Sequence, residues 1–414
     1  MATLNSLLRW AGLSGWSRLF LIAPFALNPV FLFYSANGMS EMPFLLFFTA
    51  STAYFLRWLT TERWQESMFA GFSTALMFGC RYDAVPYAAA FTLGMLGVLM
   101  YSRSSIQLER AEAHLLLYLA PTIYAVFLWL YFNWLIVGDP IFFLRSNYSN
   151  AYLTRNMALD PQVAAIRGSW PLAIRYLVAT TGSLSPLYII LGPVAAVQAF
   201  RQRDMGLAGL LLLTLAPPVF QFVMYRGGQT FGFLRFYISV QPGAVLLAAY
   251  LLRQCHGWAR RALLSLVAVS LAAGVWTSCI AMQQSSQDAA FIQLLRGPRT
   301  VTDNWENDRT AAAALRLRFE ERPVLVLADS QAENVVLFSM IPHRFILPSD
   351  PDFEQALSEP SKYADYVLIG VRSHDEVQNF AIQERYPDLY EFGGTGLVLD
   401  SEVGRFRLYR SVNR

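Results

Sequence analysis

The chain has 414 residues, of which 55% are hydrophobic and 15% charged, with a mean hydropathy of +0.35. Soluble domains carry about 25% charged residues, so this composition excludes a cytosolic enzyme and any purely soluble fold. The net charge of +3 comes almost entirely from arginine, since Lys362 is the only lysine. Because the arginines lie between apolar runs, they indicate membrane topology and not a nucleic-acid surface. The three scattered cysteines support neither a disulfide framework nor a zinc site.

Nine apolar runs have roughly the length that a helix needs to cross a bilayer, about 15 to 25 residues. They cover residues 18–35, 43–59, 67–80, 84–101, 113–137, 182–200, 206–225, 237–252 and 262–282. Arginine is about twice as dense in the connections on one side as on the other, which places the N-terminus in the cytoplasm. We therefore expect residues 1–282 to form a mainly α-helical, polytopic domain in a lipid bilayer, the plasma membrane of a bacterium.

The run 67–101 has two interpretations. One long helix would carry Arg81 and Asp83 at its centre, where charges are costly in a bilayer. A hairpin would put both residues at the membrane boundary, and Pro86 disfavours a helical conformation in the residue before it. We favour the hairpin, although 67–80 is short for a full span.

The composition changes near residue 283, where charged residues become frequent and apolar runs shorten. Strands are predicted from short runs that begin at Pro323, Val335, Arg344, Asp365, Gly396 and Phe406. Helical periodicity covers 308–321 and 374–386, the second opened by a Ser373–Glu376 capping box. Residues 283–414 are therefore expected to be a soluble α/β domain. We expect it on the extracytoplasmic side, because nine spans put the two chain ends on opposite sides of the membrane.

The first candidate site follows the first span, in the stretch from Asn28 to Phe44. Asn37-Gly38 is ordinary chemistry for the end of a helix, and Ser40 is a candidate cap for the next one. Glu41 is the first acidic residue of the chain and lies at the outer membrane surface. It is either a favourable charge at a helix N-terminus or a functional carboxylate.

Arg81 and Asp83, in GCRYDAVPY, are expected on the same outer boundary as Glu41. They form either a local structural ion pair or a functional pair. In the functional interpretation Arg81 binds a phosphate through its planar fork, while Asp83 orients a hydroxyl or a metal ion.

Two further outer segments carry arginines beside aromatic residues. The long loop 138–181 contains Arg145 in a composition typical of a segment that lies on a membrane surface. The turn from Tyr225 to Pro242 carries Arg226, Arg235 and Tyr237. The turn either anchors the helix as a basic and aromatic belt at the interface, or its Arg226 and Arg235 hold a lipid phosphate in an outer pocket.

Together these stretches resemble the GT-C superfamily of polytopic glycosyltransferases, which includes the protein O-mannosyltransferases and the lipid A aminoarabinose transferases. The resemblance covers roughly residues 18–282 and rests on SANGMSEMPF, GCRYDAVP and RFYISVQP. It implies transfer of a sugar from a polyprenyl-phosphate donor to an extracytoplasmic acceptor. Glu41 and Asp83 would be the catalytic carboxylates. Donor or substrate would be bound by Arg81, Arg226, Arg235, Tyr237 and Arg145.

This sequence departs from the family mainly at the principal catalytic acid. In family members that acid lies in an outer loop upstream of the first span seen here. Residues 1–40 contain no Asp or Glu. We expect a truncated chain that binds lipid and transfers sugar weakly, with Glu41 as the substitute base. Whether a divalent cation binds at Glu41 and Asp83 is left open. A noncatalytic membrane scaffold is the alternative, and a transporter is less favoured because the sequence shows no internal repeat.

Overall fold

The computed structural model describes residues 1–101, 108–146, 149–154, 161–285, 288–296, 306–371, 381–394 and 396–412. Its internal contacts divide the chain into two compact units, Met1–Thr300 and Val301–Arg414. The boundary falls later than the change of composition near residue 283, because the short helix α16 (Ala289–Arg296) packs on α15 (Gly257–Gln284).

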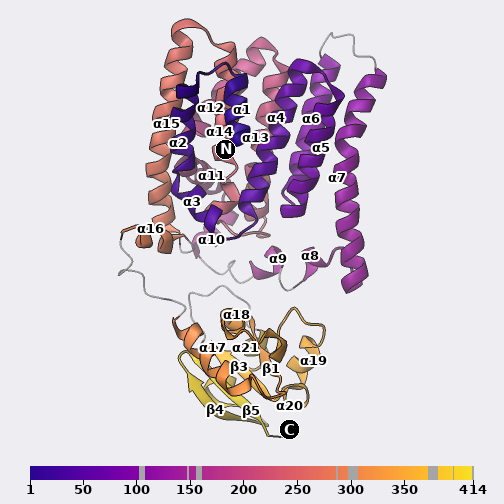
Figure 1. The fold of residues 1–414 in the computed structure, drawn as a ribbon, viewed down its shortest axis with the longest axis vertical. Coiled ribbons are helices and arrows are strands. Elements are labelled where there is room, and N and C mark those ends of the chain that lie inside the picture. The colour runs from indigo at the N-terminus through magenta and orange to yellow at the C-terminus, as the bar shows by residue number, and fades with distance from the viewer. Residues whose placement is uncertain are drawn as a thin grey trace. The chain divides into compact units, whose positions relative to one another are not determined.

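The first unit is helical (Figure 1). Apart from α15 and α16, its elements are α1 (Ala2–Trp10), α2 (Gly15–Ala26), α3 (Pro29–Ala36), α4 (Glu41–Thr61), α5 (Trp64–Cys80), α6 (Ala84–Tyr101), α7 (Leu108–Val137), α8 (Phe142–Arg145), α9 (Asn150–Leu153), α10 (Pro161–Gly168), α11 (Trp170–Leu184), α12 (Pro186–Gln202), α13 (Met205–Arg226), the 3₁₀ helix η2 (Leu234–Tyr237) and α14 (Val240–Gln254). Figure 1 shows α8, α9, α10 and α16 gathered at one end of this unit, which we call the α10 end.

Within the described residues, five helices are long and apolar enough to cross a membrane, or up to seven if two bent pairs each count as one span. The first unit is therefore built as an integral membrane domain, as its composition predicts. The hairpin is also confirmed, because α5 ends at Cys80 and α6 begins at Ala84.

Two of the expected spans are broken. Run 18–35 divides into α2 and α3 with a bend of 66°, and run 182–200 lies across the junction of α11 and α12, where the bend is 114°. A proline follows each break, at Pro29 and Pro186, and the residue before a proline is disfavoured in a helix. The side chain of Asn28 then caps α3 by accepting a hydrogen bond from the Val30 amide.

Both breaks are tied to α15 by buried polar side chains. The Asn28 amide donates to Ser278 Oγ over 3.1 Å, and Ser278 in turn donates to the Leu184 carbonyl over 3.4 Å. Gln241 donates to the same carbonyl over 2.9 Å. The Leu184 carbonyl freed by the second break is thus satisfied inside the protein, as a membrane interior requires.

The expected outer loop 138–181 is more helical than its composition suggested. It contains α8, α9 and α10, and most of α11, which starts at Trp170. Residues 147–148 and 155–160 lie outside the described part of the chain.

Helices α5 and α7 approach closely at Gly71. A Cβ atom added there would lie 2.4 Å from the Tyr118 carbonyl oxygen, so only glycine fits. Nearby, Ser51 and Thr74 share a 2.9 Å hydrogen bond, and the Tyr118 ring stacks on Phe91 at 3.8 Å. Small residues and shared hydroxyls are the usual means of joining helices in a membrane.

The second unit is an α/β domain with a five-stranded sheet in the order β2-β1-β3-β5-β4. Strands β1, β2 and β3 are parallel, and β5 is antiparallel to β3 and β4. Its elements are α17 (Glu306–Phe319), β1 (Val326–Ala328), η4 (Ser330–Ala332), α18 (Glu333–Ser339), η5 (Pro342–Arg344), β2 (Phe345–Ile346), α19 (Phe353–Ser358), α20 (Pro360–Tyr363), β3 (Tyr366–Gly370), α21 (Ala381–Arg385), α22 (Leu389–Phe392), β4 (Leu397–Val403) and β5 (Phe406–Ser411). On β3, Leu368 faces one core and Val367 the other, so helices cover both faces.

One strand expectation is wrong. The run from Val335 forms helix α18, because Val335, Val336 and Ser339 are buried at helical spacing while Leu337 is exposed. The Ser373–Glu376 capping box lies outside the described residues.

Candidate functional site

Glu41 begins α4, directly after a turn that ends α3. Gly38 adopts φ +71° in this turn, and the Met39 amide donates to Asn37 Oδ1 over 3.1 Å. Ser40 makes no capping hydrogen bond with its side chain, so the expected cap is absent. Glu41 is only 3% exposed, which is unusual for a carboxylate and requires a charged partner.

Arg81 supplies that partner from the turn between α5 and α6. Its Nη1 lies 2.8 Å from Glu41 Oε1, and its Nε lies 2.9 Å from Asp83 Oδ2. The local ion pair that the sequence left open is therefore formed. The same guanidinium joins it to Glu41, forty positions away, so Arg81 bridges two carboxylates.

Asp83 has a second partner that sequence reasoning missed. Gln221, in the interior of α13, donates to Asp83 Oδ1 over 2.6 Å. Gln221 is 2% exposed. Gln221 could have been found from the sequence as a lone amide inside an apolar run. Polar residues within membrane spans tend to face a partner.

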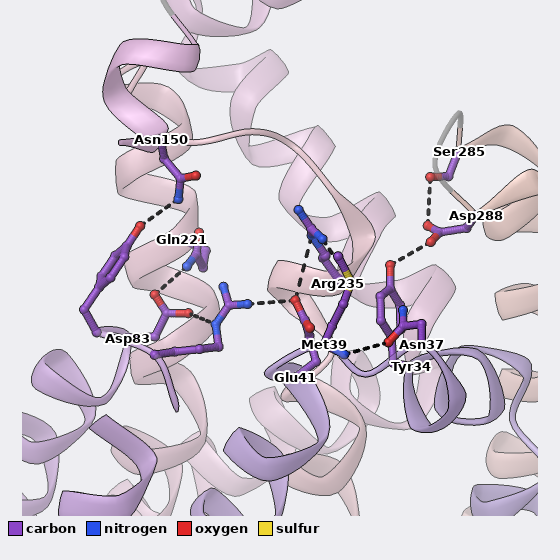
Figure 2. A network of polar contacts seen from close by, with 12 residues as sticks. Tyr34, Asn37, Met39, Glu41, Asp83, Asn150, Gln221, Arg235, Ser285 and Asp288 are labelled. Carbon is purple, nitrogen blue, oxygen red and sulfur yellow. Dashed lines mark hydrogen bonds and ion pairs between the residues drawn. The ribbon is translucent and has the colours of Figure 1, made fainter. Parts of the chain in front are cut away.

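Arg235 approaches Glu41 from η2, on the side opposite Asp83 and Gln221 (Figure 2). Its Nε lies 3.8 Å from Glu41 Oε1, and its Nη1 lies 3.2 Å from Met39 Sδ. The Phe236 ring lies 5.0 Å from the Arg81 guanidinium carbon and 5.2 Å from that of Arg235. Glu41, Arg81 and Arg235 therefore meet around one carboxylate oxygen, Glu41 Oε1. We call these three residues and Asp83 the Glu41 cluster.

The cluster is balanced in formal charge and sheltered from solvent. Its two arginine side chains are 14% and 18% exposed, and its two carboxylates 3% and 4%. Glu41 Oε1 accepts a hydrogen bond from Arg81 and lies 3.8 Å from Arg235 Nε, whereas Glu41 Oε2 is buried without a hydrogen-bond partner. A buried carboxylate oxygen without a donor is costly, and it is chemically free to accept a proton.

The other three predicted site residues lie elsewhere. Arg226 donates to the Arg167 carbonyl over 2.6 Å. Tyr237 packs its ring 6.2 Å from Tyr176, and its buried hydroxyl has no hydrogen-bond partner. Arg145, with a side chain 68% exposed, lies 3.8 Å from Asp139. None of the three contacts the Glu41 cluster through a hydrogen bond or ion pair of the described residues.

A second polar group, also drawn in Figure 2, ties α3 to the α15–α16 connection. Tyr34 donates to Asp288 Oδ1 over 2.6 Å, and Ser285 donates to Asp288 Oδ2 over 2.8 Å. Both Tyr34 and Asp288 are buried. This group fixes the segment that leads into the turn before Glu41.

A cavity of about 650 Å³ lies beside the segment that carries Arg235. Its lining includes Phe233 and Leu234 and, from α11 and α15, Thr180, Ser183 and Gln284. For metal ions, the described residues contain no group of three or more His, Cys, Asp or Glu side chains that are close enough to act as ligands.

Comparison with protein-family models gives no match for this chain, and comparison with curated proteins gives no significant match either.

Proposed function

We propose that this protein is an integral-membrane glycosyltransferase that moves a sugar from a polyprenyl-phosphate donor to an acceptor on the extracytoplasmic face. The observation that carries the proposal is Glu41 Oε2, a buried carboxylate oxygen without a hydrogen-bond donor, beside two arginines. Such an oxygen suits a general base, which must accept a proton from the acceptor hydroxyl.

In the proposed reaction, Glu41 Oε2 takes the proton of the acceptor hydroxyl as the hydroxyl oxygen bonds to the anomeric carbon of the sugar. The bond from that carbon to the phosphate oxygen breaks, and polyprenyl phosphate leaves with the electron pair. Arg81 and Arg235 hold Glu41 in place through Oε1. Asp83 orients Arg81, and Gln221 orients Asp83. Glu41 takes the role of the family's usual catalytic acid, which has no match in residues 1–40.

The proposed orientation puts the α10 end outside the membrane. Arg57 and Arg63 flank the end of α4, Arg201 and Arg203 the end of α12, and Arg253, Arg260 and Arg261 the connection from α14 to α15. These arginines mark the opposite end as cytoplasmic under the positive-inside rule. The proposal further counts nine crossings of a bacterial plasma membrane, more than the five to seven spans that length and composition identify in the described residues. An odd number of crossings would place the second unit outside as well.

The test is sugar transfer in proteoliposomes with labelled polyprenyl-phosphate hexoses and pentoses. Glu41→Gln should lower the rate by about 10² to 10⁴, the usual loss on removing a general base. Glu62→Gln, an exposed carboxylate at the end of α4, is the matched control and should keep the wild-type rate. Equal rates for the wild type and Glu41→Gln, or no transfer by the wild type from any donor, would contradict the proposal.

A noncatalytic membrane scaffold is the second candidate. The observation that favours it is the charge balance of the Glu41 cluster, in which two carboxylates and two arginines already neutralise one another. A scaffold predicts that Glu41→Gln changes stability while no transfer occurs in any variant.

A further inference from the structure

Two arginines at the α10 end have no carboxylate partner in the part of the chain that the structure describes. Arg167 lies in the last turn of α10 and Arg226 in the last turn of α13. Their buried N–H groups also lack acceptors, at Nε and Nη2 of Arg167 and at Nε of Arg226. The missing carboxylate distinguishes them from Arg81 and Arg235, which share Glu41.

The two arginines are fixed next to the same turn. Arg226 Nη1 donates to the Arg167 carbonyl over 2.6 Å, and its guanidinium carbon lies 4.1 Å from the centre of the Trp170 ring. The Arg167 guanidinium packs over Gly228, two residues after Arg226. A Cβ atom at Gly228 would lie 3.2 Å from the central carbon of that guanidinium, and Gly228 also adopts φ +72°. Glycine here both makes the turn and leaves room for Arg167.

Two like charges beside one turn repel each other, and buried N–H groups without acceptors are costly. A single anion with several oxygens removes both costs. Phosphate fits best, because its oxygens accept pairs of N–H groups from the planar fork of arginine. We propose that Arg167 and Arg226 together form a binding site for the phosphate group of a ligand.

Trp170 indicates where that phosphate comes from. Its ring stacks on Arg226 and is still 57% exposed at the start of α11. Exposed tryptophans at helix ends are typical of the headgroup level of a membrane. The site therefore suits a lipid-linked phosphate, with free phosphate as the other source of the same chemistry.

This inference rests on the proposed function only for the identity of the lipid, polyprenyl phosphate. It also assigns phosphate binding and proton transfer at the α10 end to different residues. Because Glu41 and Asp83 already neutralise Arg81 and Arg235, the phosphate charge is held by Arg167 and Arg226, and the Glu41 cluster is left for proton transfer.

The experiment measures binding by native mass spectrometry and by ligand-induced thermal stabilisation of the purified full chain. One arm adds polyprenyl phosphate in phosphatidylcholine nanodiscs, and the other adds inorganic phosphate. Arg167→Gln and Arg226→Gln should each weaken binding about 10-fold to 100-fold, the effect of losing a charge-assisted hydrogen-bond pair. Arg175→Gln, an exposed arginine on α11, is the charge-matched control and should bind like the wild type. Arg226→Lys keeps the charge without the fork and should bind with intermediate strength.

Wild-type binding of the lipid or of inorganic phosphate that depends on Arg167 and Arg226 supports the site, and the arm in which it occurs identifies the source. The inference is overturned if neither ligand binds, if both glutamine variants bind like the wild type, or if Arg175→Gln weakens binding equally. Phosphate binding without sugar transfer in any condition would remove the proposed function and leave this site standing.

Discussion

Gln221 and Asp83 are 138 positions apart in sequence, and a 2.6 Å hydrogen bond joins them in the buried interior of the first unit. It connects α13 to the turn between α5 and α6, and through Arg81 it reaches Glu41. The orientation of a carboxylate near the α10 end therefore depends on an amide within an apolar helix.

We expect Gln221→Ala to destabilise the protein by about 1.5 to 3 kcal/mol, because Asp83 Oδ1 would lose its donor while staying buried. Transfer activity should fall with it, since Asp83 orients Arg81. Thermal unfolding in detergent and the proteoliposome assay measure the two effects. Gln229→Ala, at an exposed position after α13, serves as the control and should change neither. An unchanged melting temperature for Gln221→Ala would show that the hydrogen bond contributes nothing to stability.

Gly71→Ala should separate α5 from α7. The new methyl group would meet the Tyr118 carbonyl at 2.4 Å and the Leu117 carbonyl at 3.0 Å, and backbone atoms cannot move aside cheaply. Overpacking of this kind costs about 1 to 3 kcal/mol. Gly79→Ala is the matched control on the same helix, because no atom lies within 4 Å of its Cβ position. The two variants should differ clearly in thermal stability, and equal stability would rule out the close approach.

The proposed topology predicts opposite labelling of two introduced cysteines in a background whose native cysteines are replaced by serine. Ser358→Cys, exposed on the second unit, should react with a membrane-impermeant maleimide in intact cells. Ser14→Cys, exposed between α1 and α2, should react only after permeabilisation. Labelling of residue 14 and protection of residue 358 in intact cells would reverse the map.

The second unit should lose stability in acid through Asp400. Hydrogen bonds from Arg318 hold the pKa of the Asp400 carboxyl below its ordinary value. Because the folded-state pKa is lowered, this stabilisation is present above the ordinary aspartate pKa and is lost as the pH falls through the folded-state value. Both side chains are partly exposed, so the contribution is about 1 kcal/mol or less. Asp400→Asn should flatten the acid side of the curve of melting temperature against pH, and Asp352→Asn, an exposed carboxylate before α19, should leave it unchanged.

The sequence was most informative about helix ends. Asn37-Gly38 marked the end of α3, and Arg81 and Asp83 marked the hairpin. The cost of charges inside a bilayer, together with Pro86, therefore put both turns at one end of the unit. The partners were harder to predict. Arg226 and Arg235 are nine residues apart in one turn, yet Arg226 contacts α10 and Arg235 contacts Glu41. That choice depends on the turn at Gly228 and the path of η2, which no local pattern specifies.

Apolar runs led to two kinds of wrong prediction, and each has a physical reason. Composition does not distinguish a buried strand from a short buried helix, so the run from Val335 was assigned to the wrong element. A continuous apolar run also hides a break, although Pro29 and Pro186 were visible signals at both. The second break persists because side chains on distant helices satisfy the freed Leu184 carbonyl, and the first is capped locally by Asn28.

The ties from α3 to α15 have a consequence for how the protein is made. Asn28 and Tyr34 find their partners Ser278 and Asp288 only 250 and 254 residues later in the chain. At synthesis rates of about 5 to 20 residues per second, α3 waits roughly 12 to 50 seconds for them. The turn that holds Glu41 thus leaves the ribosome well before the residues that secure it in the membrane.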